Sequence, residues 1–199
     1  MSMKKSLLFG LLAVFGGLIG LVLLVAGWFI STQNNLVNLD ESTKEKWSQV
    51  ENVYQRRADL IPNLVNTVKG YAKHEATVLE EVTKARSQVG QVKIQSTEDL
   101  PKFEKAQSEL TSALSRLLVV SEKYPDLKAD RNFQELQSQL EGTENRITIE
   151  RRRFNEAAKE YNIYIRQFPQ SIVAGMKSFH EKPYFTAEVT AKTAPKVEF

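Results

Sequence analysis

The sequence contains no cysteine and only two histidines, His74 and His180, which lie far apart. The absence of cysteine excludes disulfides, a thiol nucleophile and thiolate metal sites. Glu141 and Glu144 are spaced three apart, but no Glu-x-x-His motif occurs, which is the motif that builds di-metal sites in helical bundles. No phosphate-binding glycine loop or nucleophile elbow is present either. We therefore expect no enzyme, no metal and no cofactor.

The sequence also lacks a strong excess of charge of one sign. It has 27 basic and 24 acidic residues and a net charge of +3, and two of the basic residues, Lys4 and Lys5, precede an apolar segment. A nucleic-acid-binding domain usually shows a stronger basic bias, so we expect no nucleic-acid partner. The basic run 151–153 lies between Glu150 and Glu156, and we interpret it as a solvated helix face rather than a phosphate-binding patch.

Residues 7–30 contain no charged side chain and are almost wholly apolar. A helix needs about 20 such residues to cross a bilayer, and Trp28 and Phe29 stand at the far end, where interfacial aromatics fit. The alternative is a cleaved signal peptide, whose apolar core would be about 7–15 residues and would end at a small-x-small site. Since this segment is longer and has no such site, we expect an uncleaved transmembrane anchor in contact with membrane lipid.

The charges around the anchor predict its orientation. Lys4 and Lys5 precede it, whereas residues 31–39 contain no basic residue. By the positive-inside rule, residues 1–6 are a short cytoplasmic N-terminus, and the rest lies on the extracytoplasmic or periplasmic side of a single-pass cell (inner) membrane protein. Gly16 and Gly20 have the small-xxx-small spacing that favours helix packing in membranes, so a homo-oligomer is expected.

From Asp40 onward, apolar residues recur in steps of three and four, which is typical of one face of a helix. Because proline lacks an N–H, Pro62 predicts a kink or break near residues 59–61. The pattern then resumes and continues to Val89, and residues 90–97 are interpreted as a connection. The apolar positions of this part are Trp47, Val50, Tyr54, Ala58, Ile61, Leu64, Val68, Tyr71, Val78, Val82, Ala85 and Val89.

Two further helices follow. Thr97 or Asp99 can cap the next helix, Pro101 is tolerated in its first turn, and the helix should end near residues 124–125. Residues 126–130 form a short link, with Asp130 as N-cap of a last long helix that ends at residues 168–169. Many apolar residues of that helix are seven apart, which suits a coiled-coil-like seam. They are Phe133, Leu136, Leu140, Ile147, Phe154, Tyr161, Ile165 and Phe168.

These patterns predict an all-α fold. Residues 31–182 are expected to form an antiparallel bundle of long helices, and the transmembrane helix is expected to be nearly continuous with the first of them. No strand-like alternation appears before residue 183. Residues 183–199 are predicted to be an irregular or partly extended tail that docks its aromatic side chains on the bundle.

Two polar sets stand out as candidate interaction or structural residues. The first flanks the proline and comprises Trp47, Arg56, Arg57, Asp59, Pro62 and Asn63. Pro62 leaves a backbone carbonyl near Ala58 without its helical partner, and arginine or asparagine can supply a new one. The set therefore either fixes a kink and pairs with an adjacent helix or forms a partner-binding surface, and the structural interpretation is favoured.

The second set comprises Glu141, Glu144, Asn145, Asn155 and Asn162. Asn155 and Asn162 are seven apart and follow Phe154 and Tyr161, which places them near one helix face. Partly buried amides can fix the register of a bundle at a cost in stability. This structural role is again favoured over a binding role.

The sequence resembles the LemA family of bacterial membrane proteins over nearly its full length. The most specific block runs from Arg56 to Glu75 and begins Arg-Arg-Ala-Asp-Leu-Ile-Pro-Asn; the other matching blocks are residues 35–37, 47–52, 124–128, 136–145, 161–162, 168–169 and 195–199. The resemblance implies one N-terminal membrane helix and a helical bundle. It supplies no catalytic residues, and one branch of the family is associated with magnetosome membrane formation, which makes membrane organisation an expectation by analogy.

Two functional hypotheses follow. In the first, anchored copies associate and organise or shape the cell-envelope membrane. In the second, the bundle is a membrane-tethered binding module or adaptor for another envelope protein or peptide. The long helices and the glycine-bearing anchor favour the first, whereas the aromatic tail and the polar cluster at residues 56–63 favour the second.

Overall fold

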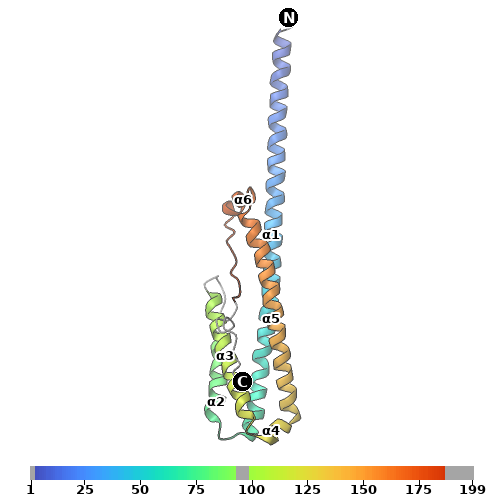
Figure 1. Cartoon of the computed structure of the whole chain (residues 1–199). Helices are drawn as coiled ribbons and strands as arrows, with labels where there is room; N and C mark the ends of the chain where they lie inside the picture. Colours follow the sequence, from blue (N-terminus) through green and yellow to red (C-terminus); the bar gives the residue numbers. More distant parts are fainter. Residues whose placement is uncertain (1–2, 93–98, 187–199) are drawn as a thin grey trace, which may run out of the picture. The chain divides into compact units, whose positions relative to one another are not determined.

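The computed structural model describes residues 3–92 and 99–186 and shows an all-α fold, with no strand among these residues (Figure 1). This confirms the predicted fold class. The helices are α1 (Met3–Tyr71), α2 (Ala76–Gln91), α3 (Asp99–Ser121), α4 (Pro125–Ala129), α5 (Arg131–Arg166) and α6 (Gln170–Met176).

Helix α1 is a single element from Met3 to Tyr71, so the apolar segment continues directly into the first helix of the bundle, as predicted. It is the one helix in the described ranges 3–92 and 99–186 that is long and apolar enough to cross a membrane, and its most apolar window has a mean hydropathy of 2.6. The large apolar side chains from Phe9 to Val25 are all exposed. Among the described residues, nothing lies within 4 Å of a Cβ built on Gly16 or Gly20, so no other described segment packs against these glycines.

Of the predicted kink or break near residues 59–61, the break is wrong, because α1 continues through Pro62, and the kink stays a prediction. Pro62 cannot donate the backbone hydrogen bond that the Ala58 carbonyl would normally accept. Arg86 of α2 supplies the replacement, since its Nε donates to the Ala58 oxygen at 2.8 Å. The need for a polar partner was therefore predicted correctly, but the partner comes from a neighbouring helix and not from the residues flanking the proline.

The apolar pattern between Leu64 and Val89 does not form one helix. Helix α1 ends at Tyr71, and α2 begins at Ala76. Residues 73–75 are polar and provide no apolar side chain that could pack in the core at this point. Two helices, each with its own apolar face, therefore replace the one that the pattern predicted. Helices α2 and α3 then lie side by side (Figure 1).

The chain around α4 differs from the predicted link in one respect, since residues 125–129 form a short helix. Asp130 caps α5 as predicted, because its Oδ1 accepts a hydrogen bond from the Phe133 N–H at 2.9 Å. This hydrogen bond, followed by one from Tyr71, lowers the pKa of Asp130 below its ordinary value. Of the two residues suggested as caps for α3, Thr97 lies outside the described residues and Asp99 is the first residue of the helix as described.

The end of α5 also differs from the prediction. The helix ends at Arg166, and Phe168 is 82% exposed and lies outside it, so Phe168 is not part of the seam. The short helix α6 follows and buries Val173 and Ala174, and the sequence patterns did not predict it. Residues 179–186 are described without helix or strand.

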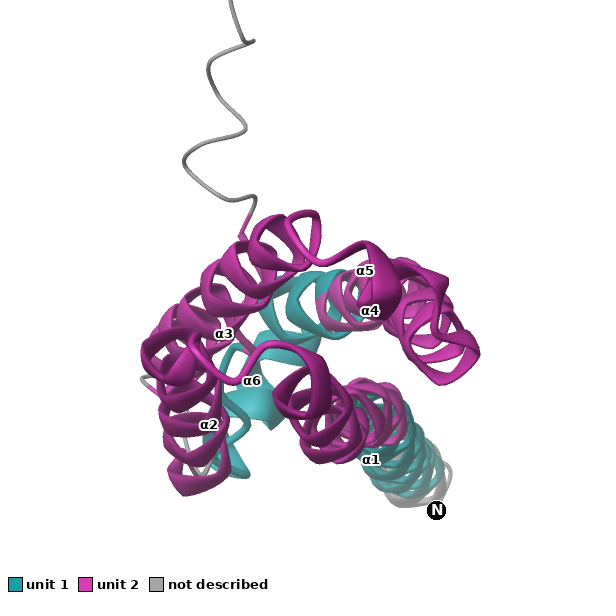
Figure 2. Cartoon of the chain, turned by 90° about the horizontal axis from the view of Figure 1, so that it is seen from below, with its two compact units in different colours: residues 1–43, 159–181 teal, residues 44–158, 182–199 magenta. Residues whose placement is uncertain are grey.

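The chain divides into two compact units, coloured separately in Figure 2: residues 1–43 with 159–181, and residues 44–158 with 182–199. The first unit has a small apolar core, whose buried members are Leu36, Tyr161, Ile165, Val173 and Ala174. The second unit has two apolar clusters. One centres on residues of α1, α2 and α3 such as Leu64, Val82 and Leu110, and the other gathers Tyr54, Phe103, Phe154 and Phe185.

Candidate functional site

A buried arginine links the two predicted polar sets within the second unit. Arg57 of α1 is only 3% exposed, and its Nη1 donates to Oε2 of Glu144 on α5 at 2.5 Å. Its Nη2 donates to Thr111 Oγ1 at 2.8 Å and to the Gln107 carbonyl at 3.3 Å, both on α3. One guanidinium therefore joins three helices through directional, charge-assisted hydrogen bonds. We refer to Arg57, Gln107, Thr111 and Glu144 as the arginine cluster.

The arginine cluster suits a structural role better than a chemical one. Removing the Arg57 charge from water is costly, and its ion pair with the half-exposed Glu144 offsets part of that cost. Arg57 stays protonated in a protein, so it offers no acid–base chemistry. Burial raises the pKa of the neighbouring Tyr54, against the opposing effect of Arg151 and Arg57, so Tyr54 remains a neutral phenol. A fixed guanidinium of this kind selects which helix faces meet.

Three other members of the first set are exposed to solvent. Arg56, Asp59 and Asn63 are exposed, and Asp59 accepts a hydrogen bond from Gln55 Nε2 at 2.8 Å. Asn63 lines an open groove of about 470 Å³ between α1 and α5. The groove is lined mainly by amide and other polar side chains: Asn63, Asn66, Thr67, Asn132, Glu135, Leu136 and Gln139. The residues around the proline therefore contribute to two different sites: Arg57 to the buried arginine cluster and Asn63 to the surface groove.

The second set is also divided. Glu141 is exposed and accepts a hydrogen bond from Gln137 Nε2 at 3.1 Å, and Asn145 is exposed as well. Asn162 is 1% exposed and belongs to the first unit, whereas Asn155 belongs to the second. Asn155 is partly buried and Asn162 is buried, and their role in fixing the register of the bundle stays a prediction.

Trp47 belongs to an aromatic group that holds part of the C-terminal segment. The Phe185 ring stacks on Trp47 with ring centroids 5.7 Å apart and planes inclined by 13°. Phe154 meets both rings edge-on, at 5.5 Å from Phe185 and 5.3 Å from Trp47, and Phe103 meets Trp47 at 6.1 Å. Such offset and edge-on pairs add stability beyond burial. Of the tail residues expected to dock, Val189, Pro195, Val197 and Phe199 lie outside the described residues.

Polar side chains beside these rings bind the backbone of the same segment. Asn155 Nδ2 donates to the Phe185 carbonyl, and its Oδ1 accepts from the Phe185 N–H, both at 2.9 Å. Arg151 Nη2 donates to the Thr186 carbonyl at 2.8 Å, and Glu104 Oε1 accepts from the Thr186 N–H at 3.2 Å. We call the group of Trp47, Phe103, Glu104, Arg151, Phe154 and Asn155 the aromatic seat.

Sequence reasoning missed Arg151 and Glu104. Arg152 and Arg153 have largely exposed side chains, in agreement with the solvated-face interpretation, but the Arg151 side chain is only 25% exposed. Its Nη2 lies 2.9 Å from Glu104 Oε1, and its guanidinium carbon lies 4.7 Å from the centre of the Phe185 ring. The spacing from Ile147 to Arg151 and on to Phe154 repeats the helical step of the apolar face, and this was the available signal.

The comparisons with known proteins show the family of the chain. A family model described as the LemA family matches residues 46–199. The chain belongs to the LemA family. This confirms the resemblance seen in the sequence, and the match covers nearly all of the second unit, including the arginine cluster and the aromatic seat.

Three curated relatives of this LemA-family chain are compared with it by identity and by the share of each sequence that matches. The magnetosome protein MamQ 2 of Paramagnetospirillum magneticum is 27% identical to the chain over 80% of the chain's length. The matched part covers 66% of that relative, slightly under two thirds of its length. The magnetosome protein MamQ of Magnetospirillum gryphiswaldense is 28% identical over 75% of the chain and 65% of its own length. Protein LemA of Metamycoplasma hominis is 22% identical over 80% of the chain and 71% of its own length.

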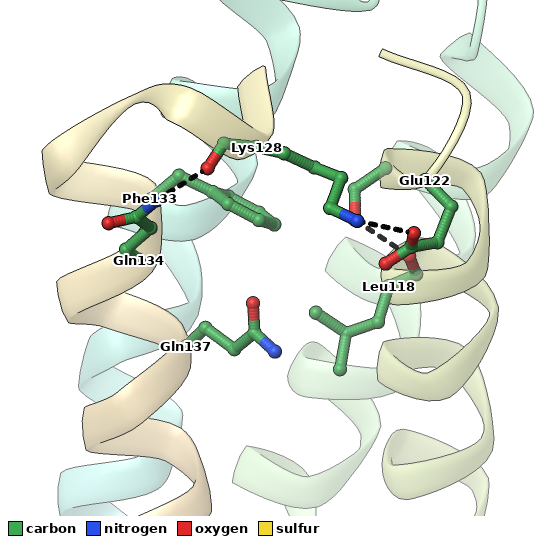
Figure 3. A pocket seen from close by; sticks show the side chains of 7 residues that line it. Leu118, Glu122, Lys128, Phe133, Gln134 and Gln137 are labelled. Carbon is green, nitrogen blue, oxygen red and sulfur yellow. Dashed lines mark hydrogen bonds and ion pairs between the residues drawn. The ribbon is translucent and has the colours of Figure 1, made fainter. Parts of the chain in front are cut away.

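A second hollow in this LemA-family bundle is small. It holds about 220 Å³ and is lined by Leu118, Ser121, Glu122, Lys128, Phe133, Gln134 and Gln137. Figure 3 shows Gln137 and Leu118 facing it, with Lys128 Nζ bound to Glu122 Oε2 at 2.6 Å. Within residues 3–92 and 99–186, no three His, Asp or Glu side chains gather in a way that could hold a metal ion. The polar side chains that line the hollow are thus one ion pair, two amides and the Ser121 hydroxyl.

Proposed function

We propose that the chain is a non-enzymatic, membrane-anchored helical protein whose copies assemble to organise or shape the cell-envelope membrane. The observation that carries the proposal is the apolar part of α1. Phe9 is 72% exposed and Leu24 75%, and the large apolar side chains between them are exposed as well. A continuous apolar surface of this size is unfavourable in water and is covered by a lipid hydrocarbon core in this proposal.

Two further features support assembly. Gly16 and Gly20 present a small-residue face that nothing within residues 3–92 and 99–186 covers, as a helix–helix contact in a membrane requires. Two of the relatives are named as magnetosome proteins, and membrane organisation was already an expectation by analogy with the family. In the proposed topology, residues 1–6 are cytoplasmic, residues 7–30 cross the inner membrane once, and the bundle lies on the extracytoplasmic side.

Native mass spectrometry of the full-length protein, released from the membrane in a mild detergent, tests the assembly. The proposal predicts a defined oligomer that persists on dilution. A strict monomer at high protein concentration, with the anchor intact, would contradict it. Protease accessibility of the bundle in intact inside-out and right-side-out vesicles tests the topology separately, since the bundle should be cleaved only in right-side-out vesicles.

A second candidate function is a membrane-tethered binding module for another envelope protein or peptide. The observation that favours it is the amide-lined groove at Asn63, Asn66 and Asn132, because exposed amides can bind a peptide backbone. Crosslinking in native membranes followed by affinity capture tests this function. The variant Asn63→Ala/Asn66→Ala should lose the partner, and Asn145→Ala, on an exposed part of α5, should retain it. Recovery of self-contacts alone would favour assembly.

A further inference from the structure

The aromatic seat recognises the backbone of the C-terminal segment in the way that a neighbouring strand would. Asn155 uses both ends of its amide, donating to the Phe185 carbonyl and accepting from the Phe185 N–H at 2.9 Å each. The Thr186 N–H and carbonyl are bound in turn by Glu104 and Arg151. In these pairs the side chains of Asn155, Glu104 and Arg151 take the place of the partner strand's backbone, and hydrogen bonds to a peptide's main chain provide affinity largely independent of its side chains.

The seat also distinguishes side chains. Phe185 is only 6% exposed, because Trp47 stacks on its ring and the Phe154 ring packs against it at an interplanar angle of 74°. The Arg151 guanidinium lies near the same ring, where a cation–π interaction is favourable. Thr186 Oγ1 donates to Glu104 Oε2 at 3.3 Å. By contrast, Tyr184 is 42% exposed. The chemical class of ligand is therefore an extended peptide with an aromatic residue followed by a hydroxyl residue.

The connection of this segment to its seat is indirect. The segment groups with residues 44–158, but the chain between them, Lys159–Glu181, belongs to the other unit. Residues 179–186 carry no helix or strand of their own. All of the contacts just described are made by two residues, Phe185 and Thr186. The seat therefore binds a short segment that does not directly continue any of the helices that form the seat. An identical element from another copy satisfies the same contacts, which is the basis of domain swapping.

We propose that the aromatic seat is a peptide-binding site that takes the Phe185–Thr186 segment of a second copy of this chain, so that exchange of the segment links anchored copies. The inference rests on the proposed assembly at the membrane and names the contact that would build it. Anchoring confines copies to one surface and raises their effective concentration for one another. Exchange then adds no new type of contact, because each seat is filled in either arrangement.

The absence of cysteine allows a direct test with the full-length protein in its membrane. Two differently tagged copies are co-expressed, one with Ser108→Cys and the other with Tyr184→Cys, and are treated with a short bismaleimide. Ser108 is exposed and lies one helical turn from Glu104, and neither substitution removes a recognition contact. The proposal predicts crosslinked heterodimers. A chain carrying both cysteines serves as the control for reagent reactivity.

Matched variants make the crosslink specific. Phe185→Ala in the copy with Tyr184→Cys should abolish it, whereas Phe185→Ala in the copy with Ser108→Cys should increase it by removing the competing segment. Asn155→Leu in the Ser108→Cys copy should also abolish it, and Asn145→Leu should not. A pair of Asn132→Cys and Tyr184→Cys should give none, since Asn132 lies about 35 Å along α5 from Asn155.

Three outcomes would overturn the exchange. If only the control chain that carries both cysteines is crosslinked, and only within itself, each segment occupies the seat of its own chain. A heterodimer that persists after Phe185→Ala in the donor copy reflects contact elsewhere. If native mass spectrometry shows an oligomer but no heterodimer is crosslinked, the exchange fails while the proposed assembly stands, and a strict monomer contradicts both.

Discussion

The two ends of α1 place apolar side chains in opposite surroundings. Between Phe9 and Val25 the large apolar side chains are exposed around the helix, whereas between Val50 and Val68 they are confined to one buried face. The first stretch has no charged residue, and the second carries several charges and buries one, that of Arg57. One regular helix therefore presents a surface suited to lipid and then a surface suited to a bundle core in water.

The first prediction disrupts the lipid-facing stretch and has the largest expected effect. Leu18→Arg/Val22→Arg places two charges near the middle of the proposed anchor, at a cost of about 3 kcal/mol each. The protein should move from the alkaline-extracted membrane pellet to the soluble fraction. Leu18→Ala/Val22→Ala is the matched control and should stay in the pellet. Retention of the arginine variant in lipid would refute the anchor.

The second prediction concerns the charge that the bundle-facing stretch buries. Arg57→Ala removes hydrogen bonds to α3 and α5 and should lower the free energy of unfolding by about 3 kcal/mol. Arg56→Ala, at the exposed neighbouring position, should change it by less than about 0.5 kcal/mol. Denaturant unfolding of the full-length protein in detergent, followed by circular dichroism, measures both. Equal effects at the two positions would show that the arginine cluster contributes nothing specific.

The third prediction tests how α1 remains helical through Pro62. Arg86→Met should cost about 1 kcal/mol, because the Ala58 carbonyl loses its hydrogen bond from Nε. In a Pro62→Ala background the restored backbone N–H can bind that carbonyl, so the same Arg86→Met change should cost less. A double-mutant cycle on the free energy of unfolding measures the coupling. Strictly additive effects would mean that Arg86 and Pro62 act independently.

The fourth prediction is a pH dependence at the start of α5 and is expected to be the smallest effect. The Phe133 N–H and then Tyr71 hold the pKa of Asp130 below its ordinary value of 3.8. A carboxylate with a lowered folded-state pKa stabilises the fold above the unfolded-state value and loses that contribution as the pH falls through the folded-state value. As the pH is lowered below about 4, the melting temperature of the natural protein should therefore decrease more steeply than that of Asp130→Asn. The asparagine keeps a capping oxygen but does not titrate.

Asp126→Asn, on exposed α4, is the control for this titration. It should leave the acid slope close to that of the natural protein. Parallel acid profiles for the natural protein and Asp130→Asn would show that Asp130 contributes no pH-dependent stability in the folded state.

Features of the fold that depend on nearby residues could be predicted from the sequence. The cap at Asp130 and the unpaired carbonyl at Ala58 both follow from backbone chemistry within a few residues. The identity of the partners could not, because Arg86 reaches Ala58 from another helix and Phe185 reaches Trp47 from the distant C-terminal segment. The end of α1 at Tyr71 could not be predicted, because the apolar residues keep the same helical spacing from α1 into α2.

The candidate site follows the same division. Trp47, Arg57, Glu144 and Asn155 stood out as residue types that are unusual on a helix face, and all four make specific contacts. Their grouping into an arginine cluster and an aromatic seat required the arrangement of α1, α3 and α5. Arg151 was assigned to solvent because the charges beside it masked its place on the apolar face.

Assembly of anchored copies is the central claim, and the most direct measurement counts copies in the membrane itself. The full-length protein, carrying one fluorophore per chain, can be released in native-membrane nanodiscs and its photobleaching steps counted beside a monomeric single-pass control. The account predicts particles with two or more copies at an expression level where the control shows one. A distribution of single-copy particles identical to that of the control would contradict it.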